Sequence, residues 1–349
     1  MRYACLLFAG LAVFITACGA GGTTTGGVVL TANHRLPVVA LPGYDITIFA
    51  PTNDSRPIAT NPDSIAVDGE HVFIDYQNVT AKDCTDEKTS TVIEYNMEGK
   101  MLNHWTVAGH SDGMRIDPST HLVWTTSCEN GNAKFAIINP TTGTVTAYAF
   151  PPAPHGGGYD DLYFFNGSAF VAASNPTLDS SGANPNPAID KIGLGENGTL
   201  ILTPVLMGNA MATDLLSPNS PPAVLTLTDP DSLSVDNKGQ LVLVSQGDSV
   251  LVFISNPGTP QQQVSRMSVG TQLEDTVWPT GPGSLLVVDG GGVTYWIRGP
   301  FANGDIYTQS PNDSGVDNFV GVIDPKTGFE TPIAIGFRKA TGMVFVART

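Results

Sequence analysis

Charged side chains are scarce in this chain of 349 residues, and apolar runs long enough to cross a bilayer are absent after the first 17 residues. Lys, Arg, Asp and Glu make up only 14% of the sequence, whereas glycine (38) and proline (26) are frequent. The chain also lacks a CxxC pair, a Walker loop and an H-E-x-x-H motif, so none of these motifs indicates redox, nucleotide or zinc-peptidase chemistry. The composition is typical of short strands joined by turns and predicts an all-β protein.

The first residues resemble a bacterial lipoprotein signal peptide. Arg2 supplies a positive charge, and residues 4–17 form an apolar run that is too short for a stable membrane-spanning helix. The segment 15–18 (Ile-Thr-Ala-Cys) is similar to the lipobox, in which small residues precede the lipidated cysteine. We therefore predict a signal peptide over residues 1–17 and lipidation of Cys18. An ordinary signal peptide that happens to contain a cysteine is the alternative.

Residues 18–35 are predicted to form a flexible tether, because 19–27 is rich in glycine and threonine and has no apolar pattern. Gly19 is not the Asp that favours inner-membrane retention in Gram-negative lipoproteins. The resemblance therefore implies a lipid anchor in the outer membrane of a bacterial cell envelope, with the protein facing the periplasm or the surface. Without Arg2 the chain carries 15 Lys and Arg against 32 Asp and Glu, a net charge of −17. Such a surface repels nucleic acids and anionic lipids, so the anchor is the only membrane contact we expect.

Two cysteines remain for the exported chain, because Cys5 leaves with the signal peptide and Cys18 takes the lipid. In an oxidising compartment two thiols most simply pair. We therefore predict a disulfide between Cys84 and Cys128, and two free thiols are the alternative.

One segment recurs along the chain and decides the fold prediction. Each copy has an Asp, an alternating apolar strand, a turn and a second apolar strand. A period of about 40–50 residues with four short strands is that of a β-propeller blade. Copies begin at Asp63, Asp112, Asp161, Asp231 and Asp275, and a shortened copy begins at Thr341.

We predict one β-propeller domain over residues 36–349, with six blades. The copy at Thr341 supplies an inner strand, and segment 38–51 has the pattern of an outer strand without an inner partner. Placing both in one blade closes the ring and removes two exposed sheet edges. Seven blades are the alternative if the extra length before Asp231 forms another blade, and a β-sandwich array is the second alternative.

The long loops are expected on one face. In an up-and-down blade, the start of the inner strand and the loop between the second and third strands lie at the same end. The loops at 78–90, 175–197 and 290–316 are long and belong to that end. Insertions gathered on one face indicate a binding face. Cys84 and Cys128 fall in such loops of consecutive blades, which makes their disulfide geometrically reasonable.

The repeated carboxylates have two interpretations. In the structural one, each caps backbone N–H groups in the loop that enters its blade, and the periodic recurrence favours this role. In the functional one, several converge on a hard cation, for which calcium is the expected ion. Asp160 and Glu274 break the regularity and are the better metal candidates. The candidate metal ligands are Asp63, Asp161, Asp231, Glu274 and Asp275, and the binding face also includes His110, Asp112 and Asp160.

Two histidines, His110 and His155, each precede a leading Asp in adjacent blades. Paired imidazoles could bind a transition metal or transfer a proton, and His155 with Asp161 is the candidate catalytic pair. Solvated loop histidines are the alternative.

Residues 111–118 and 230–236 resemble the SMP-30/gluconolactonase and NHL/YncE-like group of TolB-like six-bladed propellers. The similarity covers the chain after the signal peptide as a repeat pattern of short motifs. It implies a divalent cation at the channel mouth, held in the lactonases by a Glu of the first blade and by an Asn and an Asp of later blades.

Only one position of this chain matches that ligand set, and the other positions carry different residues. Asp231 matches the ligand Asp, and Asp161 stands in the place of the ligand Asn. Ser111 stands in the place of an Asn that contacts substrate, and Pro62-Asp63 stands where the first-blade Glu would be.

Two functions from different classes follow. The first is a lipid-anchored propeller outside the cytoplasm that binds a small molecule, a glycan or a protein on its looped face. The second, implied by the resemblance, is a metal-dependent lactonase-like hydrolase or lyase. We expect a monomer with no nucleic-acid partner.

Overall fold

The computed structural model describes residues 38–50, 59–311 and 318–348. They lie in one structural unit, Pro37–Thr349. The predicted signal peptide, Cys18 and the tether lie outside the described residues. The described part of the chain consists of strands, turns and one short 3-10 helix, η1 (Glu196–Gly198). None of its helices has the length and apolar character needed to cross a membrane.

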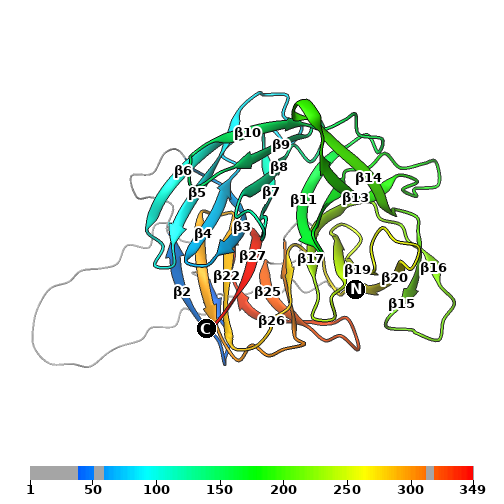
Figure 1. The fold of residues 1–349 in the computed structure, drawn as a ribbon. Coiled ribbons are helices and arrows are strands. Elements are labelled where there is room, and N and C mark those ends of the chain that lie inside the picture. The colour runs from blue at the N-terminus through cyan, green and yellow to red at the C-terminus, as the bar shows by residue number, and fades with distance from the viewer. Residues whose placement is uncertain (1–37, 51–58, 312–317, 349) are drawn as a thin grey trace, which may run out of the picture. The chain divides into compact units, whose positions relative to one another are not determined.

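Six sheets form the blades of a β-propeller (Figure 1). Blade I contains β3 (Pro62–Asp68), β4 (His71–Tyr76), β5 (Thr89–Asn96) and β6 (Met101–Ala108). Blade II contains β7 (Ser111–Ile116), β8 (Val123–Ser127), β9 (Lys134–Ile138) and β10 (Val145–Ala149). Blade III contains β11 (Gly158–Phe165), β12 (Ser168–Ser174), β13 (Pro187–Leu194) and β14 (Leu200–Met207).

The other three blades are less regular. Blade IV contains β17 (Pro230–Val235), β18 (Leu241–Ser245), β19 (Val250–Ser255), β20 (Gln263–Ser268), β15 (Met211–Asp214) and β16 (Ala223–Val224). Blade V contains β21 (Thr276–Val277), β24 (Ile306–Ser310), β25 (Phe319–Ile323), β26 (Glu330–Ile335) and β1 (Val39–Ala40). Blade VI contains β27 (Ala340–Ala347), β22 (Gly283–Asp289), β23 (Val293–Arg298) and β2 (Asp45–Ala50).

The inner strands of the six blades form a closed ring. β3 contacts β7 and β27, β11 contacts β7 and β17, and β21 contacts β17 and β27. This confirms the six-blade propeller, and the seven-blade alternative is wrong. The extra length before Asp231 forms β15 and β16 at the outer edge of blade IV, where β15 pairs parallel to β20.

Strands from early and late in the sequence close the ring, as predicted. β27 is the inner strand of blade VI and pairs with β22, and β2 is the outer strand of the same blade and pairs with β23. A second early strand, β1, extends blade V by pairing with β26. Two consecutive blades are thus completed by the same early segment.

The fifth copy of the repeat differs from its prediction. Its two strands were expected to pair in one blade, but β21 pairs with β24, and β22 pairs with β27. The link between β21 and β22 contains Pro279 and Pro282, which have no N–H to donate to a tight antiparallel pair. The hairpin β22–β23 therefore belongs to blade VI, and the segment 290–316, expected as one loop, contains β23 and β24.

Apolar side chains fill the spaces between neighbouring blades. Phe170 and Leu206 of blade III pack in one cluster with Leu233 and Leu243 of blade IV. β19 is apolar on both faces because each face of a blade is covered by a neighbour. This packing fixes the inner strands and leaves a channel along the ring axis.

Candidate functional site

The channel has three parts that differ in size and polarity. At the end where the inner strands begin, a cavity of about 160 Å³ opens, here called the mouth. Below it lies a narrow neck with a free volume of about 20 Å³. At the other end lies a chamber of about 480 Å³, here called the rear chamber.

The mouth is acidic. Lys82 and Lys339 also line it, together with backbone and amide groups of the loops between second and third strands. The shared position of these loops and the leading carboxylates follows the up-and-down geometry expected from the sequence. The carboxylates that line the mouth are those of Asp63, Asp112, Glu129, Asp160, Asp229, Asp231 and Glu274.

Two predicted metal ligands, Asp161 and Asp275, lie deeper, in the neck. The guanidinium of Arg115 lies between them, with Nη2 2.5 Å from Asp161 Oδ2 and 3.3 Å from Asp275 Oδ1. The same carboxylates accept backbone N–H groups, Asp161 from Leu233 at 3.0 Å and Asp275 from Met343 at 2.8 Å. Both carboxylates are thus engaged in contacts that join the blades.

The predicted catalytic histidine, His155, is fully buried and is not among the residues that line the mouth. Its Nε2 donates to the carbonyl oxygen of Gly158 at 2.6 Å, and its ring packs edge-on against Tyr159. The structure therefore does not bring His155 and His110 into one site.

Three side chains at the mouth converge in a group that could hold a metal ion. One donor atom each from His110, Asp112 and Glu129 lies within 4.8 Å of the other two. The side chains of His110 and Asp112 are only 7% exposed, and that of Glu129 is 12% exposed. His110 and Asp112 begin blade II, and Glu129 follows β8 in the same blade.

The hydrogen bonds of His110 fix which nitrogen faces the group. Thr80 Oγ1 donates its proton to the carbonyl oxygen of Gln77 at 2.6 Å, so it accepts from His110 Nδ1 at 2.8 Å. Nδ1 is also 3.1 Å from the Thr80 carbonyl oxygen, a second acceptor. Nδ1 therefore carries the proton, and Nε2 presents its lone pair 3.3 Å from Asp112 Oδ1.

Burial makes this arrangement persist at neutral pH. It lowers the pKa of His110 to about 4, so the imidazole is neutral and Nε2 stays unprotonated. Nε2 is buried and makes no hydrogen bond among the described residues. Nε2 thus presents a lone pair toward the carboxyl groups of Asp112 and Glu129, and a cation could occupy the space that these three groups surround.

The pKa values of the carboxyl groups at the mouth shift in opposite directions. Burial, followed by the charge of Glu129, raises the pKa of Asp112 well above its ordinary value. Burial also pushes the pKa of Glu129 upward, but the ammonium of Lys82, which contacts Glu129 Oε1, outweighs it and the pKa falls. Burial raises the pKa of Asp160, which is hydrogen-bonded to Glu129. Glu129 is therefore ionised, while Asp112 and Asp160 hold protons more tightly than usual.

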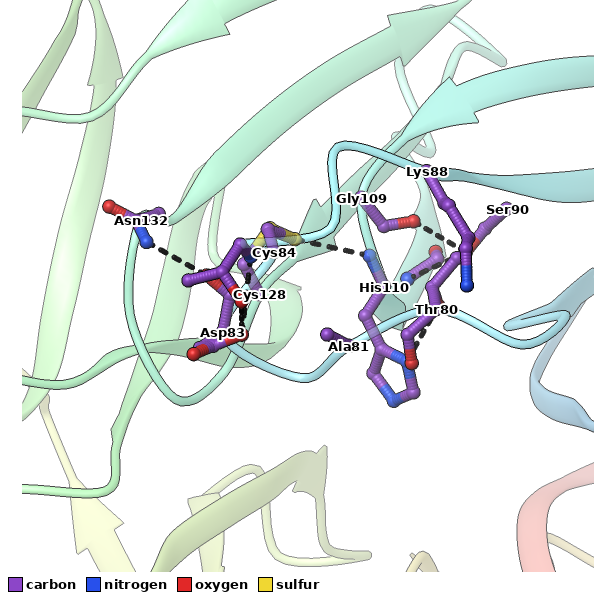
Figure 2. The surroundings of a disulfide bond; sticks show 12 residues. Thr80, Ala81, Asp83, Cys84, Lys88, Ser90, Gly109, His110, Cys128 and Asn132 are labelled. Atoms are coloured by element: carbon purple, nitrogen blue, oxygen red, sulfur yellow. Dashed lines mark hydrogen bonds between the residues drawn. A yellow bond between two sulfur atoms is a disulfide. The ribbon is translucent and has the colours of Figure 1, made fainter.

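The predicted disulfide between Cys84 and Cys128 is present, with their Cα atoms 5.5 Å apart (Figure 2). It joins the β4–β5 loop of blade I to the β8–β9 loop of blade II. The backbone N–H of His110 donates to Cys84 Sγ at 3.3 Å, and Glu129 directly follows Cys128. A Cβ at Gly109 would lie 2.5 and 2.6 Å from the two sulfur atoms, so only glycine allows this approach. The disulfide thus holds the backbone at two of the three converging side chains.

Sequence reasoning missed Glu129 and Lys82 as members of this site. Neither repeats from blade to blade, and only their position in second-to-third loops could have suggested them. The segment 109–113 (Gly-His-Ser-Asp-Gly) matches the G-x-S-x-G pattern of a nucleophile elbow. In the structure Ser111 begins β7, no helix follows, and the residue is fully buried, so it is not an exposed nucleophile.

No family model matches the sequence, and no curated protein matches it. Among solved structures, a periplasmic gluconolactonase from Pseudomonas aeruginosa is 10% identical, with 87% of this chain and 99% of that chain covered and a TM-score of 0.48. A virginiamycin B lyase from Staphylococcus aureus is 14% identical, with 88% and 94% covered and a TM-score of 0.46. A functionally unknown protein from Desulfotomaculum acetoxidans is 10% identical, with 83% and 90% covered and a TM-score of 0.47. Likeness at this level transfers no activity to this chain.

Proposed function

We propose that the protein binds a divalent transition-metal ion through His110, Asp112 and Glu129 and acts with it as a hydrolase or lyase on small molecules at the channel mouth. The observation that carries the proposal is the buried His110 Nε2, which faces the carboxyl groups of Asp112 and Glu129 and makes no hydrogen bond within the part of the chain that the structure describes. A cation bound there would coordinate Nε2, displace the proton that Asp112 holds, and add to the contact that Glu129 already makes with Lys82.

The donor set favours some ions over others. Calcium prefers oxygen ligands only, whereas an imidazole nitrogen suits zinc and related ions, and carboxylates suit manganese. We therefore favour Zn²⁺ or Mn²⁺ over the calcium that the repeated carboxylates suggested. Three protein donors also leave coordination positions open toward the mouth, which is typical of catalytic metal sites and not of structural ones.

The residues around this group supply acid–base chemistry. A bound metal ion would polarise a substrate oxygen or lower the pKa of a bound water. Asp160 lines the same cavity, and its raised pKa lets it hold a proton for a leaving group. The ammonium of Lys82 contacts Glu129 and lowers its pKa, which keeps this carboxylate ionised and able to bind a cation.

Metal titration tests the binding step. The metal content of protein purified without chelator is measured, and Zn²⁺, Mn²⁺ and Ca²⁺ are titrated calorimetrically into the metal-free protein. We expect His110→Gln and Glu129→Gln each to weaken Zn²⁺ or Mn²⁺ binding by about 100-fold or more, because each removes a direct ligand. His104→Gln is the matched control, since His104 is exposed on β6. Equal affinity in His110→Gln and the parent contradicts the proposal.

A second measurement tests the chemical step. A panel of lactones and simple esters is incubated with the metal-free and the metal-loaded protein. Turnover that chelator removes and the metal ion restores supports the enzyme. Tight metal binding without turnover of any substrate would instead favour the ligand-binding function on the looped face.

The cellular setting is the other part of this proposal. We propose a monomer anchored through a lipid on Cys18 to the outer membrane of a bacterial envelope, with a small molecule, glycan or protein as its ligand. The sequence of the first 18 residues and the excess of acidic over basic residues support it. Labelling with a radioactive fatty acid, lost in Cys18→Ala, is the direct check.

A further inference from the structure

The rear chamber differs from the mouth in volume, polarity and charge. It has a volume of about 480 Å³, within the range of about 300–1,000 Å³ that is typical of small-molecule pockets. Its wall is mainly apolar and contains the aromatic rings of Tyr163, Trp278 and Phe345. The proposed metal group lies at the other end of the channel, so the proposed activity leaves this chamber without a role.

One polar side chain in the chamber has no partner. The Oγ atom of Ser234 is buried and makes no hydrogen bond among the described residues, and the residue is only 9% exposed. Because the Oγ atom is closed off from solvent, it is not available to a ligand, and the chamber wall stays apolar at this position. Ser234 lies on the inner strand β17 and lines the chamber.

The charges at the inner end of the chamber are balanced. Arg115 lies there beside Asp275, and its guanidinium contacts Asp161, Asp275 and two backbone carbonyl oxygens. The positive charge therefore has two carboxylate partners already and does not attract an anion. The chamber offers an anionic ligand no free cation among the residues that line it.

We propose that the rear chamber is a second binding site, which takes an uncharged and mainly apolar small molecule. The apolar wall stabilises such a ligand by burying its surface, and the aromatic rings add stacking contacts.

Two naphthylamine dyes probe the chamber. N-phenyl-1-naphthylamine is uncharged, and its sulfonated analogue, 8-anilino-1-naphthalenesulfonate, is anionic; both gain fluorescence in apolar surroundings. We expect saturable binding of the uncharged dye and at least about tenfold weaker binding of the sulfonated one, because the described residues that line the chamber include no unpaired cation. Binding should be unaffected by chelator and by His110→Gln, which separates this site from the proposed metal site.

Two variants are designed to reduce the free volume of the chamber. Ser234→Leu adds bulk inside, and Thr280→Trp adds bulk at an exposed position of its lining. Each should weaken binding of the uncharged dye by about tenfold or more. Thr146→Trp on the exposed outer strand β10 is the matched control and should bind like the parent.

Failure of the parent to bind the uncharged dye overturns the proposal, and so does unchanged binding in Thr280→Trp. Urea unfolding of each variant establishes that it is folded. If Ser234→Leu does not fold, Thr280→Trp decides alone, because its side chain replaces an exposed one.

Discussion

At the scale of single residues, Arg115 makes contacts with three other blades. It extends from blade II and contacts Asp161 of blade III, the Leu233 carbonyl of blade IV, and Asp275 at the start of blade V. Its side chain is 14% exposed, so these contacts are shielded from water. Arg115 therefore connects four of the six blades through one guanidinium.

We expect Arg115→Met to lower the free energy of unfolding at pH 8 by about 3–5 kcal/mol, because it leaves two buried carboxylates without a cation. Urea unfolding followed by tryptophan fluorescence measures the loss. Arg298→Met, at an exposed arginine that donates to Thr47, is the control and should cost less than about 1 kcal/mol. A loss below about 1 kcal/mol for Arg115→Met would show that the neck does not depend on this ion pair.

The same residues show how far the sequence could predict the site. The leading Asp residues were found because they repeat, and the structure places them around one axis. Their partners were not found, because Arg115 pairs with Asp161 and Asp275 across 46 and 160 residues of sequence. Which carboxylate receives the guanidinium depends on the diameter of the closed ring, and no local pattern reports it.

At the scale of elements, the disulfide connects loops of two blades and supports the proposed metal group. We expect the double variant Cys84→Ser, Cys128→Ser to lose about 2–4 kcal/mol of stability, since it frees a closed loop with a sequence separation of 44. It should also bind the metal ion more weakly, because His110 and Glu129 lose their anchored backbone.

Unfolding curves and metal titrations with and without reductant measure both effects. Reductant should weaken the parent to the level of the double variant and leave the variant unchanged. Metal affinity that is equal in parent and variant would mean that the loops hold their positions without the disulfide.

Strand pairing was predictable where each blade is built from consecutive strands. The copy of the repeat that begins at Asp112 forms blade II from four consecutive strands, β7 to β10, as the period of four short strands predicted. In the fifth copy the apolar pattern of 284–288 correctly indicated a strand, but it did not indicate which sheet the strand joins. Pro279 and Pro282 were the available signal, because two residues without an N–H to donate disfavour a tight hairpin at this link.

At the scale of the whole molecule, buried carboxyl groups couple stability to pH. Burial raises the pKa of Asp190 to about 6 and that of Glu330 to about 7, against ordinary values of 3.8 and 4.5. The folded protein therefore binds these protons more tightly than the unfolded chain does. Their contribution to stability is complete below about pH 4 and is lost as the pH rises through 6 and 7.

We expect the urea midpoint of the metal-free protein to be higher at pH 5 than at pH 8. Glu330→Gln and Asp190→Asn should each reduce this difference, because an amide has no proton to lose. Asp179→Asn is the control, since Asp179 is exposed and its hydrogen bonds with Ser181 lower its pKa. A midpoint that rises toward pH 8 would contradict the expected sign.

Blade VI combines strands that lie far apart in the sequence, and this determines when it can form during translation. Blades I to IV are each made of nearby residues and can form while the chain is still being translated. Blade VI combines β2, the hairpin β22–β23 and β27, so β22 keeps an open hydrogen-bonding edge until the residues of β27 have left the ribosome. A nascent chain paused before residue 340 would therefore present a ready template for aggregation, and a chaperone would be needed most at that moment.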